Sequence, residues 1–226
     1  MPEKRFSKRE ALEFGWRTTR ANILIFIAFL VISMAASIFF SGFAGLFEKR
    51  LPLLSLIFNL GYVLLTIAIN IVGIKIALKF CDNDQRAMAE VISFTPSQFL
   101  KFAAGYILYS LLVAAGLILL IVPGLIFMVK YQYVAYFIAD KNTEIAEAFQ
   151  RSSGVTRGIK WELFLFLILL WLINMAGVIC FFAGLLVTIP VTMAAMAYVY
   201  RKLSGHTAEA ALNPFQAPRQ ATESNL

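Results

Sequence analysis

The residues that could carry out chemistry are few in this sequence and lie apart from one another. The only histidine, His206, is in the C-terminal segment, and all 13 Asp and Glu residues lie outside the long uncharged tracts. A histidine metal site, a Ser-His-Asp relay and a pair of acids inside the membrane are therefore excluded. No glycine pattern of the phosphate-binding type occurs. We expect no enzymatic activity, no cofactor and no metal.

Three carboxylates and two cysteines remain outside such patterns. Asp82, Asp84 and Glu90 gather in one short loop, and we interpret them as ordinary solvated loop residues. Cys81 and Cys180 fall at opposite faces of the topology predicted below, so they cannot pair within one chain. Neither belongs to a CxxC motif, and both are interpreted as small hydrophobic residues.

Polar residues within the apolar segments are the remaining candidates. At a rise of 1.5 Å per residue, Asn70 and Lys130 lie about 15 Å and Asn174 about 20 Å from the predicted cytoplasmic ends of their helices. The hydroxyl groups of Tyr131 and Tyr133 are possible partners for the lysine. A lysine near the bilayer midplane costs about 2.5–3.5 kcal/mol and by default marks a functional site. These residues predict a polar site for an anionic solute or a lipid headgroup.

The same residues also have a purely structural interpretation. Lys130 can extend along its helix toward one interface. Asn70 and Asn174 can join neighbouring helices by hydrogen bonds worth about 0.6 kcal/mol each. The sequence leaves both interpretations open.

The elements that would position these residues are apolar helices. Of the 226 residues 60% are apolar and only 15% charged, and the mean hydropathy is +0.78, whereas soluble domains are about 25% charged. Residues 21–47 and 51–74 carry no charge. Each is long enough to cross the roughly 30 Å of hydrocarbon once as a helix. The first run continues well past Ser33-Met34-Ala35, so we do not expect a cleaved signal peptide.

Two further tracts are too long for one crossing. Residues 102–139 contain only Lys130 as a charge, residues 163–200 contain none, and each tract has 38 residues. A straight helix of that length would measure about 57 Å, so each must turn back, near Pro123-Gly124 and near Ala183-Gly184. The similar positions of these breaks suggest a repeated unit. The predicted fold is all-α and polytopic, with six transmembrane helices in three hairpins over residues 21–203.

The basic residues predict the orientation of these six spans. Residues 1–20, 75–101, 141–160 and 201–226 fall on one side and carry 17 of the 20 Lys and Arg residues. The other side receives Lys49 and Arg50. The positive-inside rule then places both termini in the cytoplasm. The net charge of +7 is explained by this topology and by anionic headgroups. Membrane lipids and other membrane proteins are the expected partners, and nucleic acid is not.

Short amphipathic helices are expected on the cytoplasmic side. Ser7-Lys8-Arg9-Glu10 has the form of a capping box, and residues 1–20 form an amphipathic segment, either separate from the first span or continuous with it. Thr95-Pro96-Ser97-Gln98 is a second helix start. Ile145–Ser152 forms a third amphipathic stretch, ended by Ser153-Gly154. Residues 204–226 lack apolar periodicity and are predicted to be a disordered cytoplasmic tail.

Across residues 7 to 203 the chain resembles a group of uncharacterised bacterial multi-pass membrane proteins, related to the membrane domain attached to some glycerophosphodiester phosphodiesterases. The resemblance lies in the order of Ala11, Gly15-Trp16, Asn22, Pro123-Gly124, Lys130-Tyr131, Tyr133, Ala139-Asp140, Ala148, Arg151-Ser152, Gly158, Trp161, Leu163-Phe164, Gly184-Leu185, Pro190 and Ala197-Tyr198. The resemblance implies a six-helix membrane domain in a bacterial cytoplasmic (inner) membrane, and no activity. The catalytic domain, a TIM barrel of about 250 residues, has no counterpart in this sequence.

The function expected from the sequence is that of a non-catalytic membrane protein. It would organise or assist in the membrane by binding lipid or a membrane partner through its basic cytoplasmic face. The alternative is a small transporter or channel for an anionic solute or lipid that uses the level of Asn70, Lys130 and Asn174.

Overall fold

The computed structural model describes residues 6–83, 88–180 and 183–205, and all regular elements within them are helices. In chain order they are α1 (Lys8–Ala21), α2 (Ile23–Phe47), α3 (Pro52–Cys81), α4 (Met88–Ile92), α5 (Pro96–Leu119), α6 (Ile121–Tyr131), α7 (Val134–Lys141), α8 (Ile145–Thr156), α9 (Lys160–Ile179) and α10 (Leu185–Leu203). The all-α prediction is confirmed. Asp84, His206 and almost all of the predicted tail lie outside the described residues.

Five stretches of helix are long and apolar enough to cross a membrane. They are α2, α3, α5, the stretch Ile121–Lys141 that comprises α6 and α7, and α9. The sixth predicted span, α10, is not among them. It has 19 residues, and its last turn carries Arg201 and Lys202.

Two predicted helix starts are confirmed at the level of single hydrogen bonds. Ser7 caps α1, its hydroxyl accepting a bond of 3.3 Å from the backbone N–H of Glu10. Thr95 caps α5 in the same way, accepting from the N–H of Gln98 at 3.2 Å. Helix α1 ends at Ala21, and Asn22 separates it from α2. Of the two alternatives for the N-terminal segment, the structure has the separate helix.

The turns differ in detail from the sequence prediction. In the first long tract the turn between α5 and α6 is Leu120 alone, and Pro123 and Gly124 lie within the first turn of α6. Proline fits there because the first turn of a helix does not need its N–H. A second interruption, at Gln132 and Tyr133, separates α6 from α7. Helix α8 continues through Ser153 and Gly154 to Thr156. The chain changes direction only at Gly158, whose φ of +89° is the left-handed conformation that glycine adopts without strain.

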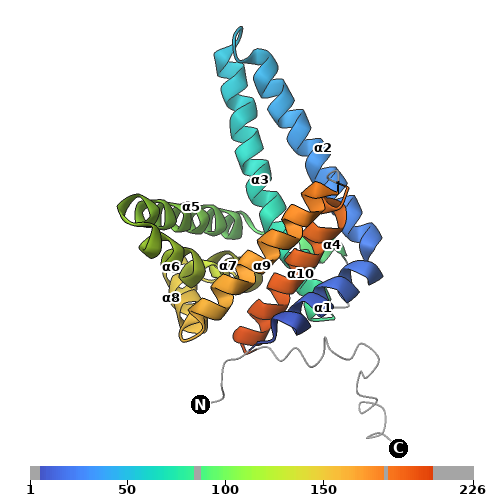
Figure 1. The fold of residues 1–226 in the computed structure, drawn as a ribbon. Coiled ribbons are helices and arrows are strands. Elements are labelled where there is room, and N and C mark those ends of the chain that lie inside the picture. The colour runs from blue at the N-terminus through green and yellow to red at the C-terminus, as the bar shows by residue number, and fades with distance from the viewer. Residues whose placement is uncertain (1–5, 84–87, 181–182, 206–226) are drawn as a thin grey trace, which may run out of the picture.

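Helix α10 occupies the centre of the molecule, with α1, α3 and α9 packed against it (Figure 1). Eleven of its 19 residues are buried. Phe14 of α1 stacks on Tyr198 at 5.0 Å between ring centroids. Gly15 lies against the backbone carbonyl of Val191, where any Cβ atom would collide with that oxygen. The N-terminal amphipathic helix is therefore packed closely onto the core.

Glycines also allow close packing where consecutive helices meet. A Cβ at Gly116 would lie 2.8 Å from the Cα of Gly124, and a Cβ at Gly184 would lie 2.8 Å from the Cα of Gly177. Both contacts are shorter than side chains permit, so α5 with α6, and α9 with α10, approach at a pair of glycines. Small residues at such crossings are typical of membrane helices, which gain stability from close van der Waals packing.

We predict that Gly124→Ala destabilises the protein by about 1–3 kcal/mol, the usual cost of overpacking. The added methyl group would meet the backbone N of Leu117 at 2.7 Å, and backbone atoms cannot move aside cheaply. Gly154→Ala in α8 is the matched control, because nothing lies within 4 Å of its Cβ position. Unfolding of the purified protein in mild detergent measures both variants. Equal stability of the two would contradict the close contact.

Candidate functional site

A buried arginine holds two aspartates at the base of the helix bundle. Arg201 is only 5% exposed. Its Nη1 donates to Asp140 Oδ2 at 2.5 Å, and its Nη2 donates to Asp140 Oδ1 at 2.8 Å and to Asp82 Oδ2 at 2.5 Å. The arrangement with Asp140 is the bidentate pairing that a planar guanidinium forms with a carboxylate. The Asp82 carboxylate is partly open to solvent, at 38% side-chain exposure.

The three charged residues come from the C-terminal ends of three helices. Asp82 follows α3, Asp140 lies in the last turn of α7, and Arg201 lies in the last turn of α10. Carboxylates are disfavoured at helix C-termini because the helix dipole is negative there, and the guanidinium offsets this cost. The hydroxyl of Tyr200 donates a further bond to Asp140 at 2.9 Å.

Local backbone geometry places the two aspartates at points where the chain turns. Asn83 and Asn142 both have φ of 49°, in the left-handed region. Asparagine tolerates this conformation better than other residues with a side chain. Asn142 is the C-cap of α7, and its N–H bonds to the carbonyl oxygen of Ile138. The helices thus end close to their acidic residues.

A second polar group braces the same region. Gln98 at the start of α5 is buried, and its Nε2 donates to the carbonyl oxygens of Ile138 and Ala139, both at 2.9 Å. The ammonium of Lys75 in α3 donates to Gln98 Oε1 at 3.0 Å and to the carbonyl oxygen of Ser93 at 2.7 Å. Helices α3, α5 and α7 are therefore joined by hydrogen bonds just beside the Arg201 cluster.

The Arg201 cluster is suited to act as a structural clamp, by which we mean that its ion pairs hold the ends of three helices together. An arginine remains protonated at all relevant pH values, and the Asp140 carboxylate is occupied by Arg201 and Tyr200. Within the part of the chain that the structure describes, no three His, Cys, Asp or Glu side chains gather in a way that could hold a metal ion. We therefore interpret the cluster as fixing the relative positions of helix ends.

The sequence analysis did not predict this cluster, because it interpreted Asp82 as an ordinary solvated loop residue, whereas Asp82 pairs with Arg201. A signal was present, since Asp140 and Arg201 are the first charged residues after the two long apolar tracts. Charges at that position of successive helices are expected to meet at one face. Which of them pair cannot be read from the sequence.

Asn70 and Asn174 each have a hydrogen-bond partner, Asn70 within its own helix and Asn174 in the neighbouring helix. Asn70 is exposed on α3, and its Nδ2 donates to the carbonyl oxygen of Thr66 at 2.7 Å within the same helix. Asn174 in α9 is partly buried, and its Nδ2 lies 3.4 Å from Thr192 Oγ1 of α10. No hydrogen bond among the described residues joins either of them to Lys130.

Lys130 and the two tyrosines lie where α6 gives way to α7. The Lys130 ammonium is 4.8 Å from the centre of the Tyr131 ring, a cation–π contact. Ser152 of α8 donates to the Lys130 carbonyl oxygen at 2.9 Å. Tyr133 is fully buried, with its ring 5.9 Å from that of Tyr200. The structure thus places Lys130 with Tyr131, and Tyr133 with the tyrosine beside the Arg201 cluster.

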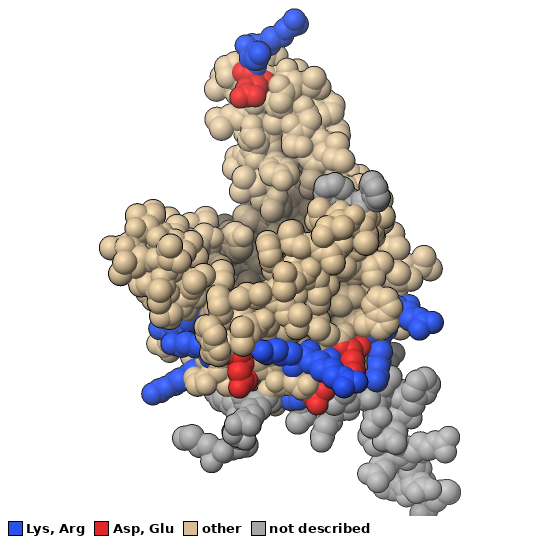
Figure 2. All heavy atoms as spheres, viewed as in Figure 1, with Lys and Arg blue, Asp and Glu red and all other residues tan. Residues whose placement is uncertain are grey.

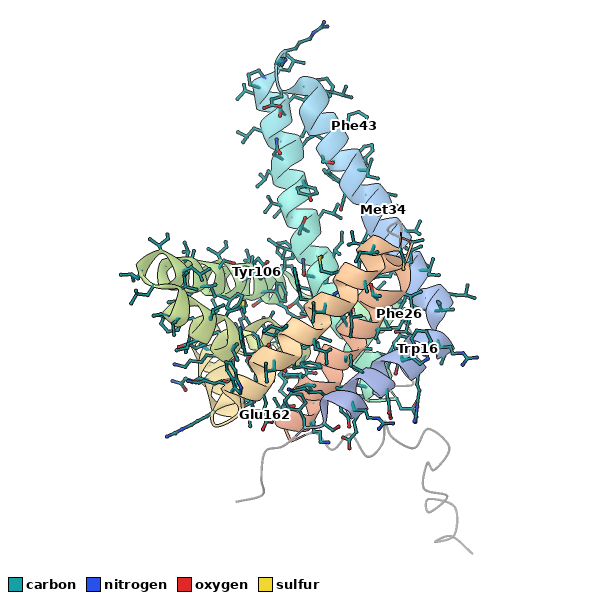
Figure 3. All side chains as sticks on the ribbon, in the orientation of Figure 1. Trp16, Phe26, Met34, Phe43, Tyr106 and Glu162 are labelled. Atoms are coloured by element: carbon teal, nitrogen blue, oxygen red, sulfur yellow. The ribbon has the colours of Figure 1, made fainter. Side chains whose placement is uncertain are left out.

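Charged residues gather along the lower edge of the molecule in Figure 2 and leave the surface above it uncharged as far as the tip of α2 and α3. On the segment that joins α8 to α9, Arg157 and Lys160 are exposed and pair with no carboxylate among the described residues. Trp161 beside them is 69% exposed. Trp16 on α1 is also exposed to the surroundings of the protein (Figure 3). Tryptophan beside basic residues is typical of the membrane–water interface.

Arg201→Met should destabilise the protein by about 3 kcal/mol or more, since it removes the guanidinium that neutralises the largely buried Asp140 carboxylate. The neighbouring Lys202→Met is the control. Lys202 also pairs with a carboxylate, Glu10 at 2.8 Å, but at the surface, where such pairs are worth about 1 kcal/mol or less. Unfolding in detergent compares the two, and similar small losses would show that the cluster is not a clamp.

The comparisons with known proteins give a family and no activity. No curated protein and no solved structure matches the chain. A family model described as a domain of unknown function, DUF7847, matches residues 49–221, which include Asp82, Asp140 and Arg201. Because this match covers well over half of the sequence, the chain belongs to the DUF7847 family.

Proposed function

We propose that this protein is a non-catalytic membrane protein that binds anionic lipid headgroups through its basic face and so assists or organises partners in the membrane. The observation that carries the proposal is the exposed pair Arg157 and Lys160, without a carboxylate partner among the described residues and beside exposed Trp161. Both cations lie near the N-terminus of α9. The positive end of the helix dipole disfavours cations there and favours an anion.

The proposal includes a membrane arrangement. Six apolar helical segments would lie in the bilayer as three pairs, with both termini on the basic face, and this face would point to the cytoplasm by the positive-inside rule. Location in a bacterial inner membrane remains a prediction. The same holds for the resemblance to the membrane domains attached to glycerophosphodiester phosphodiesterases.

Replacing Arg157 and Lys160 by Ala should weaken the binding of anionic lipid. Each basic residue near the surface contributes about 1 kcal/mol, so the double variant should lose about 25-fold in affinity. Native mass spectrometry of the delipidated full-length protein, titrated with phosphatidylglycerol and separately with phosphatidylcholine, measures this change. Phosphatidylcholine binding should not change.

The matched control is the double variant Lys49→Ala and Arg50→Ala. It removes the same net charge from the turn between α2 and α3, where two adjacent basic residues are also exposed. We expect it to bind phosphatidylglycerol as the unaltered protein does. The proposal fails if both double variants lose affinity equally, or if neither does.

A second function, transport of an anionic solute or lipid, is supported by polar atoms buried between helices. Asn174 Oδ1 and Thr188 Oγ1 are buried and have no hydrogen-bond partner among the residues that the structure describes. Unpaired polar atoms within a membrane bundle are costly unless water or a solute meets them. With Lys130, Tyr131 and Tyr133 they would line a polar path.

For this second function, Lys130→Leu should insert and remain stable but lose uptake of the solute. Removing a lysine from an apolar helix improves insertion, so a loss of transport could not be ascribed to misfolding. Flux of radiolabelled anions into proteoliposomes is the measurement, with yield and unfolding as controls. Undiminished flux in the variant, or no flux in the unaltered protein, would exclude this function.

A further inference from the structure

The tip formed by α5 and α6 is entirely apolar. Residues 111–129 contain no side chain with an oxygen or a nitrogen atom. At the tip itself, residues 118 to 122 are between 65% and 85% exposed. A turn that faces water is normally rich in Gly, Asn, Asp or Ser. This turn offers only hydrocarbon to its surroundings.

The tip of α2 and α3 has the opposite character. Its turn contains Glu48, Lys49 and Arg50, so it is suited to water beyond the hydrocarbon. In Figure 2 this charged tip stands far above the band of charges at the base, whereas the uncharged surface of α5 and α6 ends at a lower level. Helix α5 also runs across the direction of α3 rather than along it (Figure 1).

The backbone of the α5–α6 turn leaves few polar groups without partners. Leu120 is the single residue outside the helices, and its N–H donates to the carbonyl oxygen of Gly116 at 3.0 Å. Its own carbonyl oxygen accepts from the N–H of Gly124 at 3.4 Å. Pro123 has no N–H to satisfy. Such a turn is compatible with hydrocarbon, where every unpaired backbone group is costly.

The shorter helix, α6, limits the depth of the tip, because the 24 residues of α5 run across the direction of α3 (Figure 1). The 11 residues of α6 rise about 16 Å, roughly half of the hydrocarbon thickness. Its far end lies at the level of α8, because Ser152 bonds to the Lys130 carbonyl oxygen. Helix α8 carries the exposed ion pair between Glu147 and Arg151, which belongs at the interface. The tip is therefore too close to the charged face to reach the opposite one.

We infer that α5 and α6 form a re-entrant hairpin, which enters the bilayer from the basic face and ends among the lipid acyl chains. It replaces two of the six crossings predicted from the sequence. The inference rests on the membrane location in the proposed function but not on selectivity for anionic lipid. It gives the protein an apolar wedge in the leaflet that adjoins its basic residues.

Site-specific labelling tests this inference in the full-length chain. Cys81 and Cys180 are replaced by Ala, and single cysteines are introduced by Leu120→Cys, Lys49→Cys and Arg157→Cys. Right-side-out and inside-out membrane vesicles are treated with a membrane-impermeant maleimide. We expect Lys49→Cys to react from one side, Arg157→Cys from the other, and Leu120→Cys at least tenfold more slowly from both. A fluorophore at position 120 should be quenched by lipids brominated in the middle of the acyl chains.

Each alternative outcome has a separate meaning. Rapid reaction of Leu120→Cys from the Lys49 side would overturn the re-entrant hairpin and restore two full crossings. Reaction of Lys49→Cys and Arg157→Cys from the same side would overturn the membrane arrangement in the proposed function, whatever Leu120→Cys does.

A charge at the tip gives an independent test. Leu120→Lys should make insertion about a hundredfold less favourable, because the lysine would sit deep in hydrocarbon. Leu51→Lys is the matched control, since Leu51 is also an exposed leucine at a helix turn but adjoins Arg50 in the charged tip. Equal membrane yields of the two variants would contradict the inference.

Discussion

The ion pairs of Arg201 are the constraint on which the arrangement of the other helices depends. A buried guanidinium cannot remain unpaired without a large cost in free energy, so α10 can occupy the centre only where Asp140 and Asp82 reach it. The three residues lie at the ends of α3, α7 and α10. Their pairing brings three helix ends to one face, and that face must be near water because Asp82 is partly exposed.

Once this face is fixed, the length and the direction of each helix decide how far it extends from the face. Helix α3 has 30 residues and reaches a turn with three charges, whereas α6 has 11 and reaches a turn with none. Helix α5 ends at the same uncharged turn and has 24 residues, about 36 Å, but it runs across the direction of α3 (Figure 1). The short α6, the direction of α5 and the polarity of the turns therefore describe the same difference between the two tips.

The sequence predicted those features that depend on neighbouring residues. The caps at Ser7 and Thr95 follow from side chains three residues away, and the apolar tracts follow from composition. The clamp was not predictable, because Arg201 pairs with residues 61 and 119 positions earlier. The depth of Lys130 was counted along one straight helix, but the chain breaks at Leu120 and again before α7. Residue counts give depth only along an unbroken helix.

Arg201 and the exposed pair Arg157 and Lys160 have different physical roles on this face. Arg201 is buried, and its charge is neutralised within the protein, so it has no capacity to attract a ligand. Arg157 and Lys160 are exposed beside the N-terminus of α9, where the positive end of the helix dipole adds to their potential and Glu162 in the first turn offsets part of it. In the proposed function, an anionic headgroup at that point would relieve repulsion without disturbing the core. Lipid binding and fold stability would then depend on different cations, so substitutions can separate them.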